Sequence, residues 1–201
     1  MNHLAHAVLA AHDDRAIVGA LLSDFVKGDG PAAYRPDVRA EILLHRQVDV
    51  FTDSHPAVRE AVARFAPARR RFAGIALDVH FDHLLATRWA RLGEPSSIEA
   101  FSMRVCDAID RFDEPLPDDL VELGRRWRRH GGLAGYRDPD AVGFAIERLS
   151  RRLSRSGERL LATREDLHAN APDIERAFER LWPDLRAFVA TTRDALLRTA
   201  P

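Results

Sequence analysis

The sequence predicts a single all-α domain, a helical bundle that spans residues 1–201. Apolar residues recur at helical spacing, β-branched runs are scarce, and Gly and Pro divide the chain into helix-sized segments. A hydrophobic fraction of 46% beside 30% charged residues is typical of a globular chain. The length of 201 residues suits one substantial core and is short for two.

Glycine and proline set the expected helix boundaries. Gly28 suits the end of one helix, and Pro36 suits the first turn of the next, which runs to about Ser54. The tract HGGLAGYRDPD, residues 130–140, is expected to be a loop, as is segment 93–97. Helices are expected near residues 2–12, 14–27 and 36–54. A short helix should begin at Pro56, and Pro67 should separate it from a long helix that ends near Leu92. Further helices are expected near residues 98–112, 118–130, 140–154 and 172–198.

Charge and cysteine content exclude several classes of protein. Thirty basic against 31 acidic residues give a net charge of −1, which removes the positive field of a dedicated nucleic-acid binder. The single cysteine, Cys106, excludes an internal disulfide framework and a Cys-rich zinc module. No apolar run approaches the roughly 20 residues of a membrane span, and the first residues do not resemble a signal peptide. We therefore expect a cytoplasmic protein that binds neither nucleic acid nor membrane.

Acidic residues and histidines interrupt three apolar helical segments. An unpaired carboxylate in a core costs several kcal/mol, so these segments need a common source of compensation. Residues four apart on a helix lie only about 40° apart around its axis, so two of them can reach one ion. A divalent metal would therefore offset several of these charges together. The residues are Asp24 in GALLSDFVKG, His45 and Asp49 in ILLHRQVDVFTDSHP, and Asp78 and Asp82 in GIALDVHFDHLLATRW.

An Asp-rich site with one or two histidines favours Mn²⁺ or Mg²⁺, with Fe²⁺ a further candidate, over structural zinc. Such cations bind phosphate oxygens and activate water. Asp53 lies at an expected helix end, where Asp53 or Ser54 can cap the helix that begins at Pro56. His80 is expected to point away from the inward face of its helix. The alternative to a metal is a buried ion-pair network with the arginines Arg46, Arg59, Arg69, Arg70, Arg71 and Arg88.

Four motifs in register resemble the acyl carrier protein phosphodiesterase family, also called acyl carrier protein hydrolyase. They are NHLAHAVLA, GALLSDFVKG, LHRQVDVFTDSHPAVRE and LDVHFDHLLATRW, within about residues 1–89. The resemblance is thinner through Tyr136-Arg137-Asp138 and the C-terminal helices. It implies a fold like a divergent HD-domain metal phosphohydrolase. It also implies Mn²⁺- or Mg²⁺-dependent hydrolysis of the phosphodiester that joins 4′-phosphopantetheine to a serine of holo-acyl carrier protein.

By motif position, the resemblance transfers a site role to Asp24, His45, Asp49, Asp78 and Asp82. Our hypothesis is that the last four supply most of the metal ligands and that Asp24 is a further ligand or the base that orients water. Arg46 and His83 are the candidates for stabilising charge on the departing oxygen. The sequence departs from the family at Ala20, where relatives often carry Asn. It also does not reproduce the ordinary HD-domain pattern of a tandem His-Asp with a distant His and Asp, because its literal pair, His12-Asp13, lies at an expected helix end.

The implied partner, holo-acyl carrier protein, is acidic, and three basic clusters could attract it: residues 69–71, the arginines within 125–129, and residues 151–152. The competing interpretation is that these arginines form solvated, ion-paired faces. Two other functions remain open at this point. One is an HD-type phosphohydrolase acting on a nucleotide or another small phosphoester, and the other is a non-catalytic helical interaction protein. The oligomeric state is also open.

Overall fold

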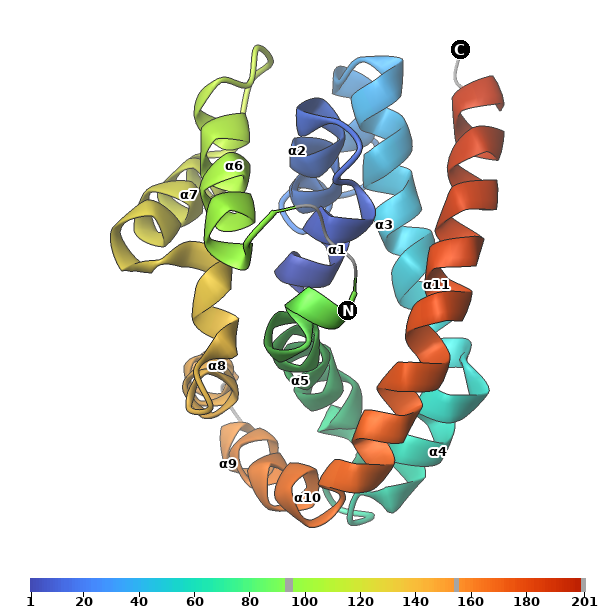
Figure 1. Cartoon of the computed structure of the whole chain (residues 1–201), viewed down its shortest axis with the longest axis vertical. Helices are drawn as coiled ribbons and strands as arrows, with labels where there is room; N and C mark the ends of the chain where they lie inside the picture. The colour runs from blue at the N-terminus through green and yellow to red at the C-terminus, as the bar shows by residue number, and fades with distance from the viewer. Residues whose placement is uncertain (93–95, 154–155, 200–201) are drawn as a thin grey trace.

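The computed structural model describes residues 1–92, 96–153 and 156–199, and these residues form helices and connecting turns without any strand (Figure 1). This confirms the predicted all-α class. None of the described helices is both long and apolar enough to cross a membrane. The α-helices are α1 (His3–Leu9), α2 (Asp14–Leu22), α3 (Pro36–Ser54), α4 (Pro56–Arg64), α5 (Ala73–Thr87), α6 (Ile98–Asp110), α7 (Asp118–His130), α8 (Ala141–Ser150), α9 (Gly157–Leu161), α10 (Thr163–Ala169) and α11 (Ala171–Thr199). Short 3₁₀ helices are η1 (Gly30–Ala33), η2 (Arg70–Phe72), η3 (Trp89–Arg91) and η4 (Gly132–Arg137).

Helix boundaries with strong local signals agree with the sequence. Helix α3 starts at Pro36, whose missing N–H costs nothing in the first turn, and α7 ends before Gly131, which has a positive φ of 79°. Helix α2 instead ends at Leu22, five residues before the predicted end, and the chain turns through Asp24. The long helix predicted to end near Leu92 divides into η2, α5 and η3.

Two helices were not predicted, and one predicted loop has regular structure. Helices α9 and α10 are short and lie between the predicted segments 140–154 and 172–198. The HGGLAGYRDPD tract contains η4. Part of the predicted loop 93–97 and the end of segment 140–154 lie outside the described residues.

Helix α3 lies at the centre of the packing that positions the site. It packs against α2 on one side and against the long α11 on the other, and α1 packs against α2 and α5 (Figure 1). The core continues between α5 and α11, where the rings of Phe81 and Phe178 lie 5.8 Å apart and both side chains are buried. The polar residues of α1, α3 and α5 therefore project from a rigid framework.

Gly19 permits the close approach of α2 to α3. A Cβ atom at this position would lie 2.9 Å from the backbone oxygen of Val38 and 2.9 Å from Cβ of Glu41. No side chain fits at that distance without moving the helices apart. The absence of a side chain at Gly19 thus brings the last turns of α2 within reach of side chains on α3.

We predict that Gly19→Ala lowers the free energy of unfolding by about 1–3 kcal/mol, because it overpacks a contact with backbone. The matched control is Gly74→Ala in α5, where a Cβ would meet nothing within 4 Å. That variant should be neutral or slightly more stable, since Ala is the better helix former. Chemical denaturation of both variants measures the difference. Equal stabilities would contradict the packing argument.

Candidate metal centre

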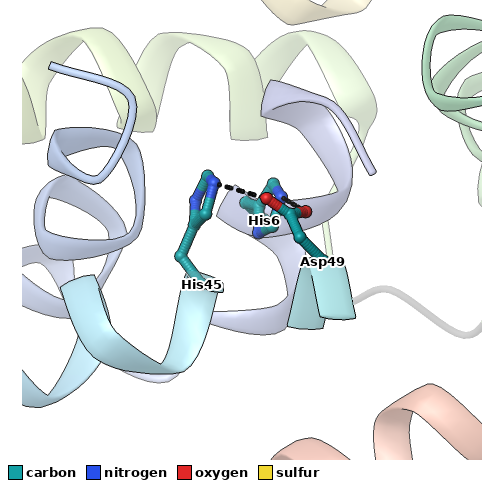
Figure 2. Close-up of side chains that lie close together, drawn as sticks. All are labelled: His6, His45 and Asp49. Carbon is teal, nitrogen blue, oxygen red and sulfur yellow. Dashed lines mark hydrogen bonds and ion pairs between the residues drawn. The ribbon is translucent and has the colours of Figure 1, made fainter. Parts of the chain in front are cut away.

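Three side chains from α1 and α3 offer donor atoms that converge on one point (Figure 2). His6 comes from α1, and His45 and Asp49 lie one turn apart on α3. One ligand atom from each lies within 4.8 Å of the others. His6 Nε2 is 3.1 Å from Asp49 Oδ1, and His45 Nε2 is 3.3 Å from Asp49 Oδ2. Two imidazoles and a carboxylate are a donor set suited to a divalent transition metal.

A backbone carbonyl fixes the orientation of His45. Its Nδ1–H donates to the carbonyl oxygen of Ala20 at 2.7 Å, and a carbonyl can only accept, so Nδ1 carries the proton. In the neutral ring, the lone pair of Nε2 then faces the carboxylate of Asp49. Two electron-rich groups facing each other at 3.3 Å require a proton or a cation between them. Because the contact is with the Ala20 backbone, it does not depend on the side chain at that position.

Asp24 lies beside this group, in the turn that follows α2. Its Oδ1 is 3.6 Å from His45 Nε2, and its Oδ2 is 3.4 Å from His3 Nε2. About half of the Asp24 side chain is exposed. The carboxylate is therefore close enough to hold a water molecule at the site, or to approach a bound ion.

Asp78 approaches the cluster from α5. Its Oδ1 lies 2.7 Å from the amino nitrogen of Met1, which is also 3.4 Å from Asp49 Oδ1. Asp78 and Asp49 thus share one positively charged neighbour. Burial raises the pKa of Asp78, and this neighbouring charge opposes the shift.

Asp82 has a different environment from the other predicted ligands. Its Oδ2 accepts the backbone N–H of Leu4 at 2.8 Å and its Oδ1 accepts that of Ala5 at 3.0 Å, in the first turn of α1. The side chain is completely buried. These two bonds satisfy N–H groups that the helix leaves without partners, and they account for the buried carboxylate without an ion. The predicted ligand role of Asp82 has no geometric support here and stays a prediction.

The protonation states of the converging side chains suit metal binding. Burial lowers the pKa of His6 to about 3, and the stacked ring of His45, 3.5 Å away, acts in the same direction. Burial alone would raise the pKa of Asp49, but its contacts with the rings of His45 and His6 and the charge of the Met1 amino group hold it far below its usual value. At neutral pH His6 is therefore uncharged and Asp49 is ionised, and these are the forms that bind metals.

Of the remaining predicted residues, Arg46 and His83 contact backbone carbonyls and not the donor atoms of the cluster. A guanidinium nitrogen of Arg46 donates to the Val26 carbonyl at 2.8 Å, two residues beyond Asp24. His83 Nδ1 donates to the Tyr136 carbonyl at 2.8 Å. Their proposed roles toward the departing oxygen stay predictions. The ring of His80 lies 5.8 Å from that of His83, and Asp53 is exposed near the end of α3.

The alternative ion-pair network is not what the described residues form. None of the six candidate arginines pairs with a site aspartate among them. Arg69 pairs with Asp166 and Glu165, and Arg88 pairs with two glutamates of α11. The site carboxylates are instead surrounded by imidazoles, backbone N–H groups and the amino group of Met1.

Sequence reasoning missed His6. It lies between Ala5 and Ala7 in an apolar segment and is buried, so the criterion that found His45 would have found it as well. Its nearest acidic partner is 43 positions away in the chain, and no i, i+4 spacing draws attention to it.

We predict that His45→Ala and Asp49→Ala each weaken Mn²⁺ binding by about tenfold or more, because each removes a donor atom from the convergent set. Titration calorimetry of the metal-free protein with Mn²⁺ measures the affinity. Asp53→Ala is the control, since it removes an exposed carboxylate one turn further along the same helix. Unchanged affinity in the first two variants would rule out this metal centre.

We also predict that Asp82 makes stability depend on pH. Burial raises its pKa from 3.8 to about 7, despite the two backbone hydrogen bonds that lower it. The folded protein therefore holds a proton that the unfolded chain releases, and the wild type should lose stability as the pH rises from about 4 to about 7. Denaturation in EDTA, with Asp82→Asn as the isosteric control, measures this effect. A constant difference between the two proteins across that pH range would contradict it.

Comparisons with known proteins identify the family to which this chain belongs. A family model described as acyl carrier protein phosphodiesterase matches residues 1–185. The acyl carrier protein phosphodiesterase of Photorhabdus laumondii is 33% identical over 183 residues, which cover 91% of this chain and 92% of the relative. That of Escherichia coli strain E24377A is 35% identical over 190 residues, covering 93% and 96%. No solved structure matches significantly, so the predicted likeness to HD domains stays a prediction. The chain belongs to the acyl carrier protein phosphodiesterase family.

Proposed function

We propose that this protein hydrolyses the phosphodiester bond between 4′-phosphopantetheine and a serine of holo-acyl carrier protein, with Mn²⁺ or Mg²⁺ bound at the candidate centre. The substrate follows from the names that its relatives carry over nearly their whole length. The products are 4′-phosphopantetheine and a carrier protein with a free serine hydroxyl. The observation that carries the metal requirement is the Nε2 atom of His45, held facing Asp49 by the Ala20 carbonyl.

The donor set fits a divalent cation that acts on phosphate. His6, His45 and Asp49 would hold the ion, with Asp24 near enough to complete its surroundings. A cation bound there would polarise a phosphoryl oxygen and lower the pKa of a bound water. Fe²⁺ is also compatible with two imidazoles and a carboxylate.

The chain's own residues supply the proton transfer and the positioning. Asp24, half exposed beside the cluster, would accept a proton from the attacking water on a carboxylate oxygen. His3, 3.4 Å from Asp24 Oδ2, orients that carboxylate. Arg46 and His83 remain our candidates for stabilising the departing serine oxygen, and this assignment is part of the proposal.

The basic clusters contribute less free charge than their sequence suggests. Arg128 pairs with Asp107 and Asp110, and Arg151 pairs with Glu147. Docking of an acidic carrier protein therefore depends on the arginines that lack such partners. Screening acts over about 10 Å at 0.1 M salt, so any such attraction weakens as salt is added.

We predict that intact-mass measurement of holo-acyl carrier protein, incubated with the full-length protein and Mn²⁺, shows loss of the 4′-phosphopantetheine group. EDTA should stop the reaction and added Mn²⁺ should restore it. Asp49→Ala should slow it at least about a hundredfold, because the ion loses a ligand, while Asp53→Ala should match the wild type.

An unchanged carrier-protein mass with Mn²⁺, Mg²⁺ and Fe²⁺ would contradict the proposed reaction, and full activity in EDTA would contradict the metal requirement. Equally efficient cleavage of bis(p-nitrophenyl) phosphate would favour an enzyme for small phosphoesters.

A further inference from the structure

A cleft of about 350 Å³ lies between α7, η4 and α8, and the function described so far does not use it. Its lining combines aromatic and cationic side chains: Arg126, Trp127, Tyr136, Phe144 and Arg148. The volume falls at the lower end of the range of about 300–1,000 Å³ that is usual for small-molecule sites. Phe144, at 64% exposure, is a large apolar side chain with no core to pack against.

The loop that forms one wall of the cleft is held in place by α6. Ser102 Oγ accepts the N–H of Leu133 at 2.9 Å and donates to the carbonyl of Gly131. Gly132 has a φ of 58°, and a Cβ there would lie 2.4 Å from the same Oγ. Only glycine fits both the backbone conformation and the contact. The wall is therefore a fixed part of the fold.

Direct contacts connect this cleft to the candidate metal centre. The ring of Trp127 lies 5.4 Å from that of His3, and His3 Nε2 lies 3.4 Å from Asp24. Beside them, Asn2 Nδ2 donates to the hydroxyl oxygen of Tyr136 at 2.6 Å. A ligand at the metal centre could therefore extend past His3 into the cleft.

Arg126 and Arg148 carry charge that the described chain does not neutralise. No carboxylate in the described residues lies within ion-pair distance of either side chain. By contrast, Arg128, on the same helix as Arg126, pairs with Asp107. Arg151, the next arginine in the sequence after Arg148, pairs with Glu147. Both charges act near the metal centre. Burial lowers the pKa of His3, and the carboxylate of Asp24 opposes this shift. The charges of Arg148 and Arg126 lower the same pKa further.

We propose that this cleft binds the 4′-phosphopantetheine arm of the substrate. The scissile phosphate would lie where the cleft meets the metal centre beside His3, with Arg126 and Arg148 contacting it from the cleft side and Trp127, Tyr136 and Phe144 covering the pantetheine chain. The inference rests on the proposed function and specifies how that site recognises its substrate. The arm joins an anionic phosphate to a flexible aliphatic and amide chain, and the cleft pairs two unneutralised guanidinium groups with an aromatic surface. The volume of about 350 Å³ suits a small-molecule group of this kind.

Binding of free 4′-phosphopantetheine to the full-length, EDTA-treated protein tests this inference without any turnover. Titration calorimetry should show saturable binding that Arg126→Ala weakens about tenfold or more, because a charge-assisted contact is lost. Phe144→Ala should weaken it several-fold, and this side chain is exposed enough for its loss to leave folding intact. Arg186→Ala and Leu197→Ala are the controls, both exposed on α11 across the molecule from α7 and α8 (Figure 1).

The outcomes separate this inference from the proposed reaction. Pantetheine without its phosphate should bind Arg126→Ala and wild type alike, which would assign the arginine to the phosphate. Absence of binding, or equal binding by wild type, Arg126→Ala and Phe144→Ala, would overturn the inference even if holo-carrier protein is hydrolysed. An Arg126→Ala defect toward apo-acyl carrier protein alone would also overturn it and assign the cleft to protein docking. Cleft-dependent binding without hydrolysis would retain the inference and reject the reaction.

Discussion

The structure depends on how it accommodates three carboxylates, Asp24, Asp49 and Asp78, that approach one another between α3, α5 and the turn after α2. Their mutual repulsion must be offset, and the chain has 30 basic side chains with which to do so. It uses none of the described arginines at this point. A guanidinium group is permanently charged and would occupy the donor atoms. An imidazole such as that of His6 or His45 can be neutral, and it can then bind a metal ion together with the neighbouring carboxylate.

The side chains that carry the donor atoms are held in position by groups that do not contact the centre themselves. The Ala20 carbonyl fixes the ring of His45, and it can do so because Gly19 brings α2 close to α3. On the far side, buried Glu41 pairs with Arg193 of α11, which also donates to the carbonyl of Leu9 at 2.7 Å. These contacts tie α1, α3 and α11 together, so His6 and His45 cannot move independently. Such support is what a site needs if its donors are to stay in place without the ion.

The sequence predicted the features whose cause is local. Pro36 and Gly131 fixed the ends of α3 and α7, and the i, i+4 spacing identified His45 and Asp49 as neighbours. Features that depend on distant parts of the chain were missed. His6 has no acidic residue one helical turn away, so its place in the site becomes evident only in the fold, where its ring stacks on that of His45. The two N–H groups that Asp82 accepts lie 77 and 78 positions away, so the sequence around Asp82 gives no sign of these bonds, and its role as a metal ligand stays a prediction.

Asp82 also positions the helix that connects the cleft to the candidate metal centre. Helix α1 contributes His6 to the centre, and the residues at its start, Asn2 and His3, contact the walls of the cleft. A helix of seven residues is too short to be stable alone, so its position must be imposed by tertiary contacts. Asp82 imposes it at the N-terminal end, although burial raises the pKa of its carboxyl to about 7 and so makes the ionised form costly. Replacing it with an apolar residue would remove that cost, but it would release α1, which contacts both the centre and the cleft. The unfavourable burial of Asp82 is therefore the consequence of positioning α1 from inside the core.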